Sequence, residues 1–353
     1  MASPASTNHE PNTSAPPQDR GGGTEGRGLI DNAGVACGSQ ATCVICGAEG
    51  EILHRELRDC LFGAPGTWNF KRCTNARCGM GWVDPMPVPS DVRKLYESYY
   101  THDSEPDSGN DAYSTRGWKA VVKGALARVL FWKADTFKSD LLFLQGRKPG
   151  RLLELGCGSG AFLRAAAKLG WKATGLDFDP AAVAVASKIP GVEARVGELT
   201  EQGFSTGSFD AVVMNNVLEH VHNPVEIITE CRRVLAPGGR LVAVTPNMEA
   251  YGHDIMGPDW RGLEIPRHLY VFTAPALIRL GRRAGFERVR SFSSPGGGAG
   301  WGIIEASYQI AEANGRGYKR QPNGARNILR REFVENALGR TKGEWVVLLA
   351  DVA

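Results

Sequence analysis

The sequence predicts an α/β fold in which helices cover both faces of a doubly wound, mostly parallel sheet, with a small cysteine-rich module in front of it. Three observations lead to this prediction. Short apolar runs alternate with helical patterns from residue 151 onward, a glycine-rich turn joins the first run to its helix, and paired cysteines precede both. Alternating strands and helices of this kind form parallel sheets that are buried on both faces.

Seven apolar runs are expected to be strands, and the segments between them carry helical spacing. The strands are expected at residues 151–155, 172–176, 193–196, 211–214, 240–245, 288–292 and 345–350. The helices are expected at residues 161–169, 180–188, 224–234 and 274–284. Asp179 and Pro180 mark one helix start, because an aspartate caps free N–H groups and proline fits a first helical turn.

Residues 119–144, ahead of the first strand, show apolar side chains at helical spacing with lysines and arginines on the other faces. We interpret this segment as a helix docked on the sheet, because surface helices of globular domains show the same pattern. An amphipathic helix lying on a membrane is the alternative.

The glycine-rich turn, Glu154-Leu155-Gly156-Cys157-Gly158-Ser159-Gly160, follows the first expected strand. A strand that ends in glycines and turns into a helix brings backbone N–H groups against a ligand. Asp177 ends the second expected strand, 21 residues after Gly156. A carboxylate at that place can hydrogen-bond a ribose diol. The sequence therefore predicts a nucleoside-containing cofactor.

NAD is one candidate for this cofactor, because Gly156, Gly158 and Ala161 fit the small positions of a dinucleotide fingerprint. Two features of the turn argue against NAD. Gly160 is a third alternate glycine that widens the turn, and Glu154 would repel a pyrophosphate. The same carboxylate could hold the ammonium group of an amino acid, directly or through water.

Four ordered motifs resemble those of the class I S-adenosylmethionine-dependent methyltransferases, at residues 154–160, 175–177, 197–199 and 208–210. The resemblance runs from about residue 151 to residue 246. It implies a Rossmann-like sheet with an antiparallel last strand, and S-adenosylmethionine as the cofactor. In that family the glycine turn cradles the methionine part, the acid after the second strand binds the ribose, and the acid after the third lies by the adenine. The resemblance assigns to the cofactor Glu154, Gly156, Gly158, Gly160, Asp177, Phe178, Glu198, Leu199 and Asn215.

Two cysteine pairs near the N-terminus predict a metal site. Cys43 and Cys46 are separated by two residues, Cys73 and Cys78 by four, and a glycine follows each pair. Each pair can aim two thiolates at one point, so the two pairs predict a tetrahedral zinc site. Because thiolates would fill all four positions, the zinc is expected to be structural. Reduced cysteines in a small core are the alternative.

The cysteines and two following segments, residues 82–87 and 95–100, are similar to a zinc-ribbon segment. Bacterial methyltransferases of small molecules, sugars and surface glycans often carry such a segment ahead of the catalytic domain. The resemblance implies an acceptor of that class.

Two histidines are candidates for a general base. Methyl transfer to oxygen or nitrogen needs a proton removed, preferably by a group that titrates near neutrality. His220 follows the fourth expected strand at the carboxyl edge of the sheet, where open α/β proteins bind ligands, and His268 follows the fifth. We expect His268, and after it His220, to be the base. A structural role for either histidine remains the alternative.

The composition narrows the function classes. A formal net charge of +3 gives no indication of a nucleic-acid partner. The sequence has no run of about eighteen apolar residues and no apolar segment of a secretory signal, so we expect a cytoplasmic protein without membrane association. The eight cysteines are clustered as expected for metal binding in a reducing compartment.

We expect four segments along the chain. These are a disordered tail over residues 1–40, a zinc-ribbon-like module over 41–100, a loop and linking helix over 101–145, and the S-adenosylmethionine-binding domain over 146–353. The expected function is methyl transfer to a small molecule, above all to an oxygen of a sugar, glycan or secondary metabolite. Basic residues between 315 and 331 suggest a phosphate-bearing acceptor, although a solvated helix face gives the same pattern. An NAD-type oxidoreductase and a catalytically inactive cofactor-binding scaffold are the alternatives.

Overall fold

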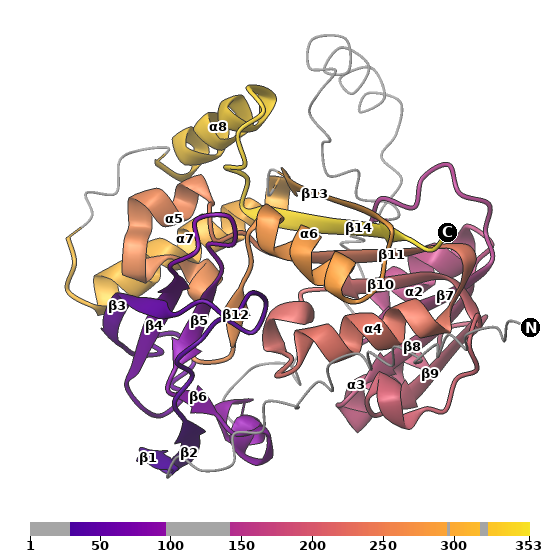
Figure 1. Cartoon of the computed structure of the whole chain (residues 1–353), viewed down its shortest axis with the longest axis horizontal. Coiled ribbons are helices and arrows are strands. Elements are labelled where there is room, and N and C mark those ends of the chain that lie inside the picture. The colour runs from indigo at the N-terminus through magenta and orange to yellow at the C-terminus, as the bar shows by residue number, and fades with distance from the viewer. Residues whose placement is uncertain (1–28, 97–141, 295–296, 318–323) are drawn as a thin grey trace, which may run out of the picture.

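The computed structural model describes residues 29–96, 142–294, 297–317 and 324–353 (Figure 1). A sheet of seven strands, in the order β13-β14-β11-β10-β7-β8-β9, forms its centre. The strands are β7 (Arg151–Leu155), β8 (Lys172–Asp177), β9 (Val192–Val196), β10 (Phe209–Asn215), β11 (Leu235–Pro246), β13 (Arg288–Ser294) and β14 (Trp345–Asp351). Only β14 runs against its two neighbours, β11 and β13, within this sheet. The predicted mostly parallel, seven-stranded Rossmann-like sheet is therefore confirmed.

Four helices cover the two faces of this sheet. They are α2 (Ala161–Lys168), α3 (Pro180–Ala186), α4 (Pro224–Val234) and α6 (Ala274–Arg283). Phe162 and Leu163 of α2 pack on one face, where Leu142 and Leu144 complete the apolar layer. Ile228 of α4 and residues of α6 fill the layer on the other face. The alternation of strands and helices thus positions every carboxyl end of the parallel strands along one edge. Of the expected helix at 119–144, all but the last three residues lie outside the described residues, and those three form no helix.

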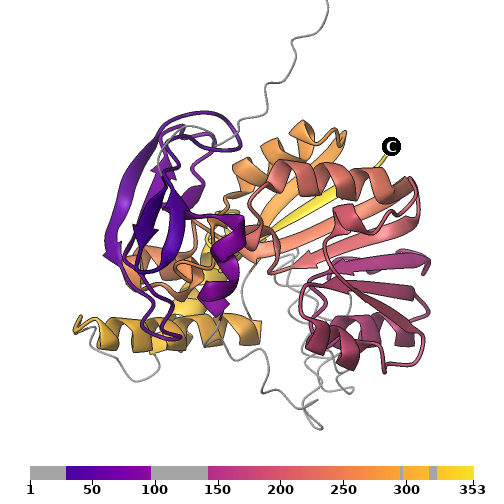
Figure 2. The same cartoon turned by 90° about the horizontal axis from the view of Figure 1, so that it is seen from below.

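The cysteines lie in a module that we define as residues 29–96 and call the cysteine module (Figure 2). Its main sheet has the order β12-β5-β4-β3, and a smaller sheet has the order β1-β2-β6. The strands are β1 (Ile30–Asn32), β2 (Val35–Gly38), β3 (Gly50–Leu57), β4 (Trp68–Cys73), β5 (Gly81–Asp84) and β6 (Met86–Pro87), followed by the 3-10 helix η1 (Pro89–Tyr96). The fourth strand of the module's sheet, β12 (Tyr270–Val271), comes from the later part of the chain, residues 142–353, and pairs with β5.

The prediction of a tail through residue 40 is wrong for residues 29–40. Strands β1 and β2 form a hairpin, and Val35 and Cys37 of β2 point inward and are fully buried. The backbone N–H of Ala36 also donates to Oδ2 of Asp91 at 2.8 Å. Alternation of apolar and small residues over only four positions is too short a pattern to predict this strand from the sequence.

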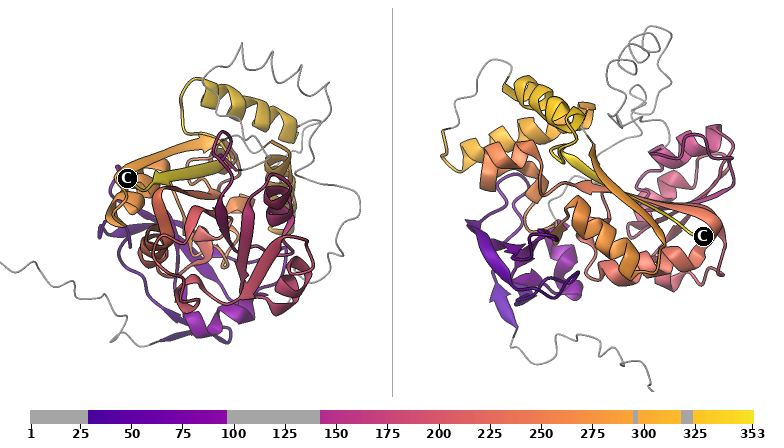
Figure 3. Two further views of the ribbon diagram at one scale, coloured as in Figure 1. Left: turned by 90° about the vertical axis from the view of Figure 1, so that its right-hand side faces the viewer. Right: turned by 45° about the horizontal axis from the view of Figure 1, so that its top comes forward.

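Three further helices pack against one another beside the central seven-stranded sheet (Figure 3). They are α5 (Tyr251–Met256), α7 (Gly297–Ala313) and α8 (Gly324–Ala337). Two short 3-10 helices, η4 (Gly257–Asp259) and η5 (Arg261–Leu263), follow α5. None of the helices in the described part of the chain is long and apolar enough to cross a lipid bilayer.

Candidate active site

The glycine-rich turn between β7 and α2 has a backbone that only glycine adopts easily. Gly156, Gly158 and Gly160 have φ values of +66°, +50° and +82°. A Cβ atom on Gly156 would lie 2.4 Å from Cγ2 of Val217, and one on Gly160 would lie 2.7 Å from Cδ1 of Ile189. The space beside Gly158 is open within 4 Å. The turn therefore packs closely on two sides and leaves its middle accessible to a ligand.

Asp177 joins the end of β8 to this turn. Its side chain is largely buried, and its Oδ2 accepts a hydrogen bond from the backbone N–H of Gly158 at 2.8 Å. Its Oδ1 accepts one from the N–H of Asp179 at 3.0 Å. Each carboxylate oxygen keeps a further lone pair. Asp177 can thus hold the turn and accept hydrogen bonds from a diol at the same time.

Glu154, the fourth of the five residues of β7, is only 4% exposed, and its Oε2 has no hydrogen-bond partner among the described residues. Burial, together with the nearby carboxylate of Asp177, raises the pKa of Glu154 well above its ordinary value. A buried carboxylate without a partner is costly unless a cation or donor arrives. The ammonium group of an amino acid is such a cation, so the site fits the methionine part of S-adenosylmethionine.

The other predicted cofactor residues lie at or just after the carboxyl ends of β8, β9 and β10. Phe178 is 67% exposed, and its ring lies edge-on to the ring of Tyr96, with 6.1 Å between the centroids. Glu198 is the N-cap of the 3-10 helix η2 (Leu199–Glu201), and its backbone N–H donates to Oε2 of Glu201 at 3.0 Å. Leu199 is buried, and Asn215 ends β10.

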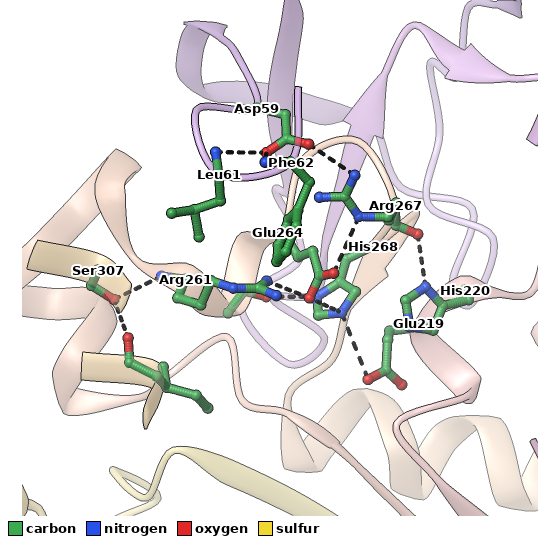
Figure 4. Close-up of polar contacts among 12 residues, drawn as sticks. Asp59, Leu61, Phe62, Glu219, His220, Arg261, Glu264, Arg267, His268 and Ser307 are labelled. Atoms are coloured by element: carbon green, nitrogen blue, oxygen red, sulfur yellow. Dashed lines mark hydrogen bonds and ion pairs between the residues drawn. The ribbon is translucent and has the colours of Figure 1, made fainter. Parts of the chain in front are cut away.

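The two predicted catalytic histidines lie together, with 4.7 Å between their ring centroids (Figure 4). His220 ends the 3-10 helix η3 (Leu218–His220), and its Nδ1 is 3.0 Å from the carbonyl oxygen of Arg267. Nδ1 of His268 is 2.9 Å from the carbonyl oxygen of Gly262. Because a carbonyl oxygen only accepts, each Nδ1 carries a hydrogen and each neutral ring has its lone pair on Nε2.

Two carboxyl groups face the Nε2 atom of His268. Oε2 of Glu264 is 3.4 Å from it and Oε1 of Glu219 is 3.9 Å from it. Burial raises the pKa of Glu219 to about 8 and lowers the pKa of His268 to about 3. Burial also opposes ionisation of Glu264, but His268, Arg261 and Arg267 together hold its pKa below its usual range. At neutral pH, Glu219 therefore carries a proton, Glu264 is ionised, and His268 is neutral.

Tyr96 is a residue of this site that the sequence did not predict. It ends η1 of the cysteine module, and its hydroxyl is 3.0 Å from Nδ1 of His220. Since its ring also contacts Phe178, Tyr96 connects the histidines with the cofactor side of the site. Tyr96 and His220 are 124 positions apart in the sequence, which explains why no local pattern signals the contact.

The four predicted metal-binding cysteines lie within reach of one point. Sγ of Cys43 is 3.7 Å from Sγ of Cys78, and Sγ of Cys46 is 3.4 Å from Sγ of Cys73. All four sulfur atoms lie within 4.8 Å of one another. Thiolates at ~2.3 Å from a tetrahedral zinc ion are roughly 3.8 Å apart, so this arrangement fits zinc.

The predicted phosphate contact receives little support. Nη1 of Arg316 binds Oδ1 of the buried Asp259 at 2.8 Å, and Nη2 of Arg331 binds Oε1 of Glu335 at 2.7 Å. Both arginines are thus engaged with carboxylates. Lys319 and Arg320, two other members of the basic segment, lie outside the described residues.

Several known proteins whose sequences resemble this chain are described as methyltransferases. A family model described as a methyltransferase domain matches residues 132–291. A ubiquinone biosynthesis O-methyltransferase from Xanthomonas oryzae pv. oryzae is 31% identical over 191 residues, which are 52% of this chain and 72% of the relative. A Mycolicibacterium smegmatis protein described as a "Probable S-adenosylmethionine-dependent methyltransferase" is 36% identical over 146 residues, covering 41% of this chain and 55% of that protein. Among solved structures, a SAM-dependent methyltransferase from Thermotoga maritima has 18% identity and a TM-score of 0.42, covering 67% of this chain and 97% of that one.

Proposed function

Because the chain belongs to the S-adenosylmethionine-dependent methyltransferases, we propose that it methylates an oxygen atom of a small-molecule acceptor. S-adenosylmethionine would supply a methyl group activated by the positive charge on its sulfur. The observation that carries the proposal is the pair of histidines, His220 and His268, because an oxygen acceptor loses a proton as it is methylated. Membership of this family removes the alternative of an NAD-type oxidoreductase.

We propose that Glu154 binds the ammonium group of the methionine part and that Asp177 binds the ribose. The partnerless oxygen of Glu154 and the free lone pairs of Asp177 support these roles. The N–H groups of the glycine turn would face the carboxylate of the methionine part. We propose that the remaining contacts come from Gly156, Gly158, Gly160, Phe178, Glu198, Leu199 and Asn215.

We infer that one of the two histidines takes the acceptor's hydroxyl proton at Nε2 while the new carbon–oxygen bond forms. The bond between the methyl carbon and the sulfur would break in the same step and leave S-adenosylhomocysteine. The ionised Glu264 beside His268 would stabilise the imidazolium that results. Glu219, which is protonated at neutral pH, adds no second negative charge and so does not hold the proton on His268 too strongly. In each neutral ring Nε2 carries the lone pair that a base needs, which supports this role. Burial lowers the pKa of both rings, and that of His268 to about 3, so a proton taken up at Nε2 of His268 would depend on stabilisation by Glu264.

We propose a sugar, glycan or secondary metabolite as the acceptor, because the segment with paired cysteines is similar to that of methyltransferases with such acceptors. A phosphate on the acceptor would find exposed cations on α8, at Arg326 and Arg330. The name of the Xanthomonas relative supports transfer to oxygen.

We propose that Cys43, Cys46, Cys73 and Cys78 hold one structural zinc ion. The positive φ angles of Gly47 (+74°) and Gly79 (+62°) shape the two turns that aim the thiolates. A site closed by four thiolates has no position for water or substrate, so the zinc would stabilise the module and leave the methyl transfer to the histidines.

The test is a turnover assay with S-adenosylmethionine carrying an isotopically labelled methyl group and a panel of phenols, sugars and nucleotide-linked sugars. The expected result is an acceptor whose mass rises by one labelled methyl group. His220→Ala and His268→Gln should lower kcat by about 10²-fold or more, the usual contribution of a general base. Methylation at carbon, or full activity of both variants, would contradict the proposal. Binding of S-adenosylhomocysteine without turnover on any acceptor would favour the inactive scaffold.

A further inference from the structure

Arg267 contacts His220 and the cysteine module, and it is linked to His268 through Glu264 (Figure 4). Its carbonyl oxygen accepts from Nδ1 of His220 at 3.0 Å. Its Nε donates to Oε1 of Glu264 at 3.2 Å, and Glu264 faces Nε2 of His268. Its Nη1 donates to Oδ2 of Asp59 at 2.8 Å. With only 2% of its surface exposed, Arg267 is a fully buried charge between two carboxylates.

Asp59 belongs to the loop between β3 and β4 of the cysteine module. Its Oδ1 accepts from the backbone N–H of Leu61 and Phe62 at 3.1 and 3.0 Å, and its Oδ2 accepts from that of Ala64 at 3.0 Å. The ring of Phe62 lies 4.9 Å from the guanidinium carbon of Arg267. Asp59 therefore shapes the loop and binds the arginine with the same carboxylate. Burial opposes its ionisation, but Arg267 lowers the pKa of Asp59 overall.

We propose that Arg267 is the positioning residue for His220 and His268, and that Asp59 of the cysteine module holds Arg267 in place. The inference rests on the proposed function, in which a histidine accepts the proton. Asp59, Arg267 and Glu264 form a row of alternating charges that ends at His268. The cysteine module thereby helps to set the proton affinity of the histidines from a loop that is 208 residues away from Arg267 in the sequence.

The charges around the histidines decide whether a substitution raises or lowers the histidine pKa. His268 is faced by Glu219, His220, Arg261, Glu264 and the carbonyl of Gly262. His220 is faced by Tyr96, Arg261, Glu264 and Arg267. Removing the charge of Asp59 leaves Arg267 less compensated, which disfavours an imidazolium and lowers the histidine pKa. Removing the charge of Arg267 leaves the carboxylates of Asp59 and Glu264 uncompensated, which favours an imidazolium and raises the histidine pKa.

The experiment measures these opposite shifts in the full chain with zinc. Histidine resonances are followed by NMR from pH 2.5 to 9 in wild type, Asp59→Asn and Arg267→Gln, because burial lowers the pKa of His268 to about 3. The turnover number kcat is measured over the range in which each protein stays folded, with an acceptor found by the turnover assay. The expected shifts are about half a pH unit or more, downward in Asp59→Asn and upward in Arg267→Gln. The acid limb of the kcat profile should move in the same directions. Cofactor affinity, measured by calorimetry with S-adenosylhomocysteine, should stay within about twofold, since neither residue touches the cofactor site.

Asp84→Asn is the matched control. Asp84 is another acid of the cysteine module, and its Oδ2 pairs with Nζ of Lys71 at 2.9 Å instead of with Arg267. The histidine pKa values of Asp84→Asn should match those of the wild type. If Arg267→Gln does not fold, Arg267→Lys replaces it, because it keeps the charge but loses the forked contact and should shift the pKa less than Asp59→Asn does.

Unchanged histidine pKa values in folded Asp59→Asn, or shifts of the same sign in Asp59→Asn and Arg267→Gln, would overturn the inference. Opposite shifts in the NMR titration with an unchanged kcat profile would support the inference about Arg267 and would count against the proposed base instead. The two readouts therefore separate a failure of the positioning role from a failure of the proposed function.

Discussion

At the scale of single residues, the site depends on carboxylates whose surroundings differ. Asp177 is bound by two backbone N–H groups, whereas Glu154, about as well buried, has an oxygen without a partner. The positions of both could be predicted, because they stand at fixed places around a glycine turn. Their surroundings could not be, since burial and partners depend on strands that are distant in the sequence.

Asp177→Ala should weaken the binding of S-adenosylhomocysteine by about 2 kcal/mol, because the contact to a diol is lost and the glycine turn loses its anchor at Gly158. Isothermal titration calorimetry measures the change. Glu193→Ala, which removes an exposed carboxylate paired with Arg195, is the control and should bind like the wild type. Near-native affinity of Asp177→Ala would remove this residue from the cofactor site.

Glu154→Gln should weaken cofactor binding but stabilise the cofactor-free protein as the pH rises. The pKa of Glu154 is raised on folding, so the folded protein holds a proton that the unfolded chain releases above its ordinary value near 4.5. Stability contributed by this residue is therefore present at low pH and is lost as the pH rises through its folded pKa. Thermal melting of the wild type and of Glu154→Gln between pH 4 and 8, without cofactor, measures this loss of stability. A difference in Tm that does not grow with pH would contradict this description of Glu154.

At the scale of elements, the strands of the central sheet and the helices that cover it could be predicted from the sequence. The short strands that connect the cysteine module with the rest of the chain could not. Periodicity alone placed α4 at residues 224–234, the range that the helix occupies. Periodicity could not place β12, which has two residues and joins the sheet of the cysteine module by pairing with β5. It also missed β2, whose burial depends on contacts with β6 and η1. Short elements are fixed by their tertiary partners, which leave no repeating pattern in the sequence.

Cys43→Ser should abolish metal binding and destabilise the cysteine module, because a structural zinc contributes its binding energy to folding. Elemental analysis should find about one zinc per chain in the wild type and much less in the variant. Cys60→Ser is the control, since Cys60 is exposed and lies outside the cluster of four sulfurs. A wild-type protein that is fully folded without metal would contradict the zinc site.

At the scale of the whole molecule, the cysteine module and the catalytic part, which comprises the described residues from 142 to 353, form one structure. Arg283 of α6 donates to the carbonyl oxygen of Val44 at 2.9 Å, and the hydroxyl of Thr273 donates to the carbonyl oxygen of Cys78. Nε2 of His54 lies 3.1 Å from Nε2 of His253 on α5. The segment boundaries expected from the sequence give no indication of these contacts, because the contacts join residues about two hundred positions apart.

Unfolding should therefore be a single cooperative transition in differential scanning calorimetry, and removal of zinc by a chelator should lower the Tm of the whole chain. The physical reason is that loss of the module exposes the buried Arg267 and the edge of β12 together. Two separated transitions, with only one of them sensitive to the chelator, would show that the module and the catalytic part are energetically independent.

The most direct measurement is a crystal structure of the full chain with S-adenosylhomocysteine. We expect the ammonium group of the ligand within hydrogen-bond distance of Glu154 and its ribose hydroxyls on Asp177. Its sulfur should point toward His220 and His268. A ligand bound elsewhere, or one that leaves the carboxylate of Glu154 buried without a partner, would contradict the assignment of this pocket to the methyl donor.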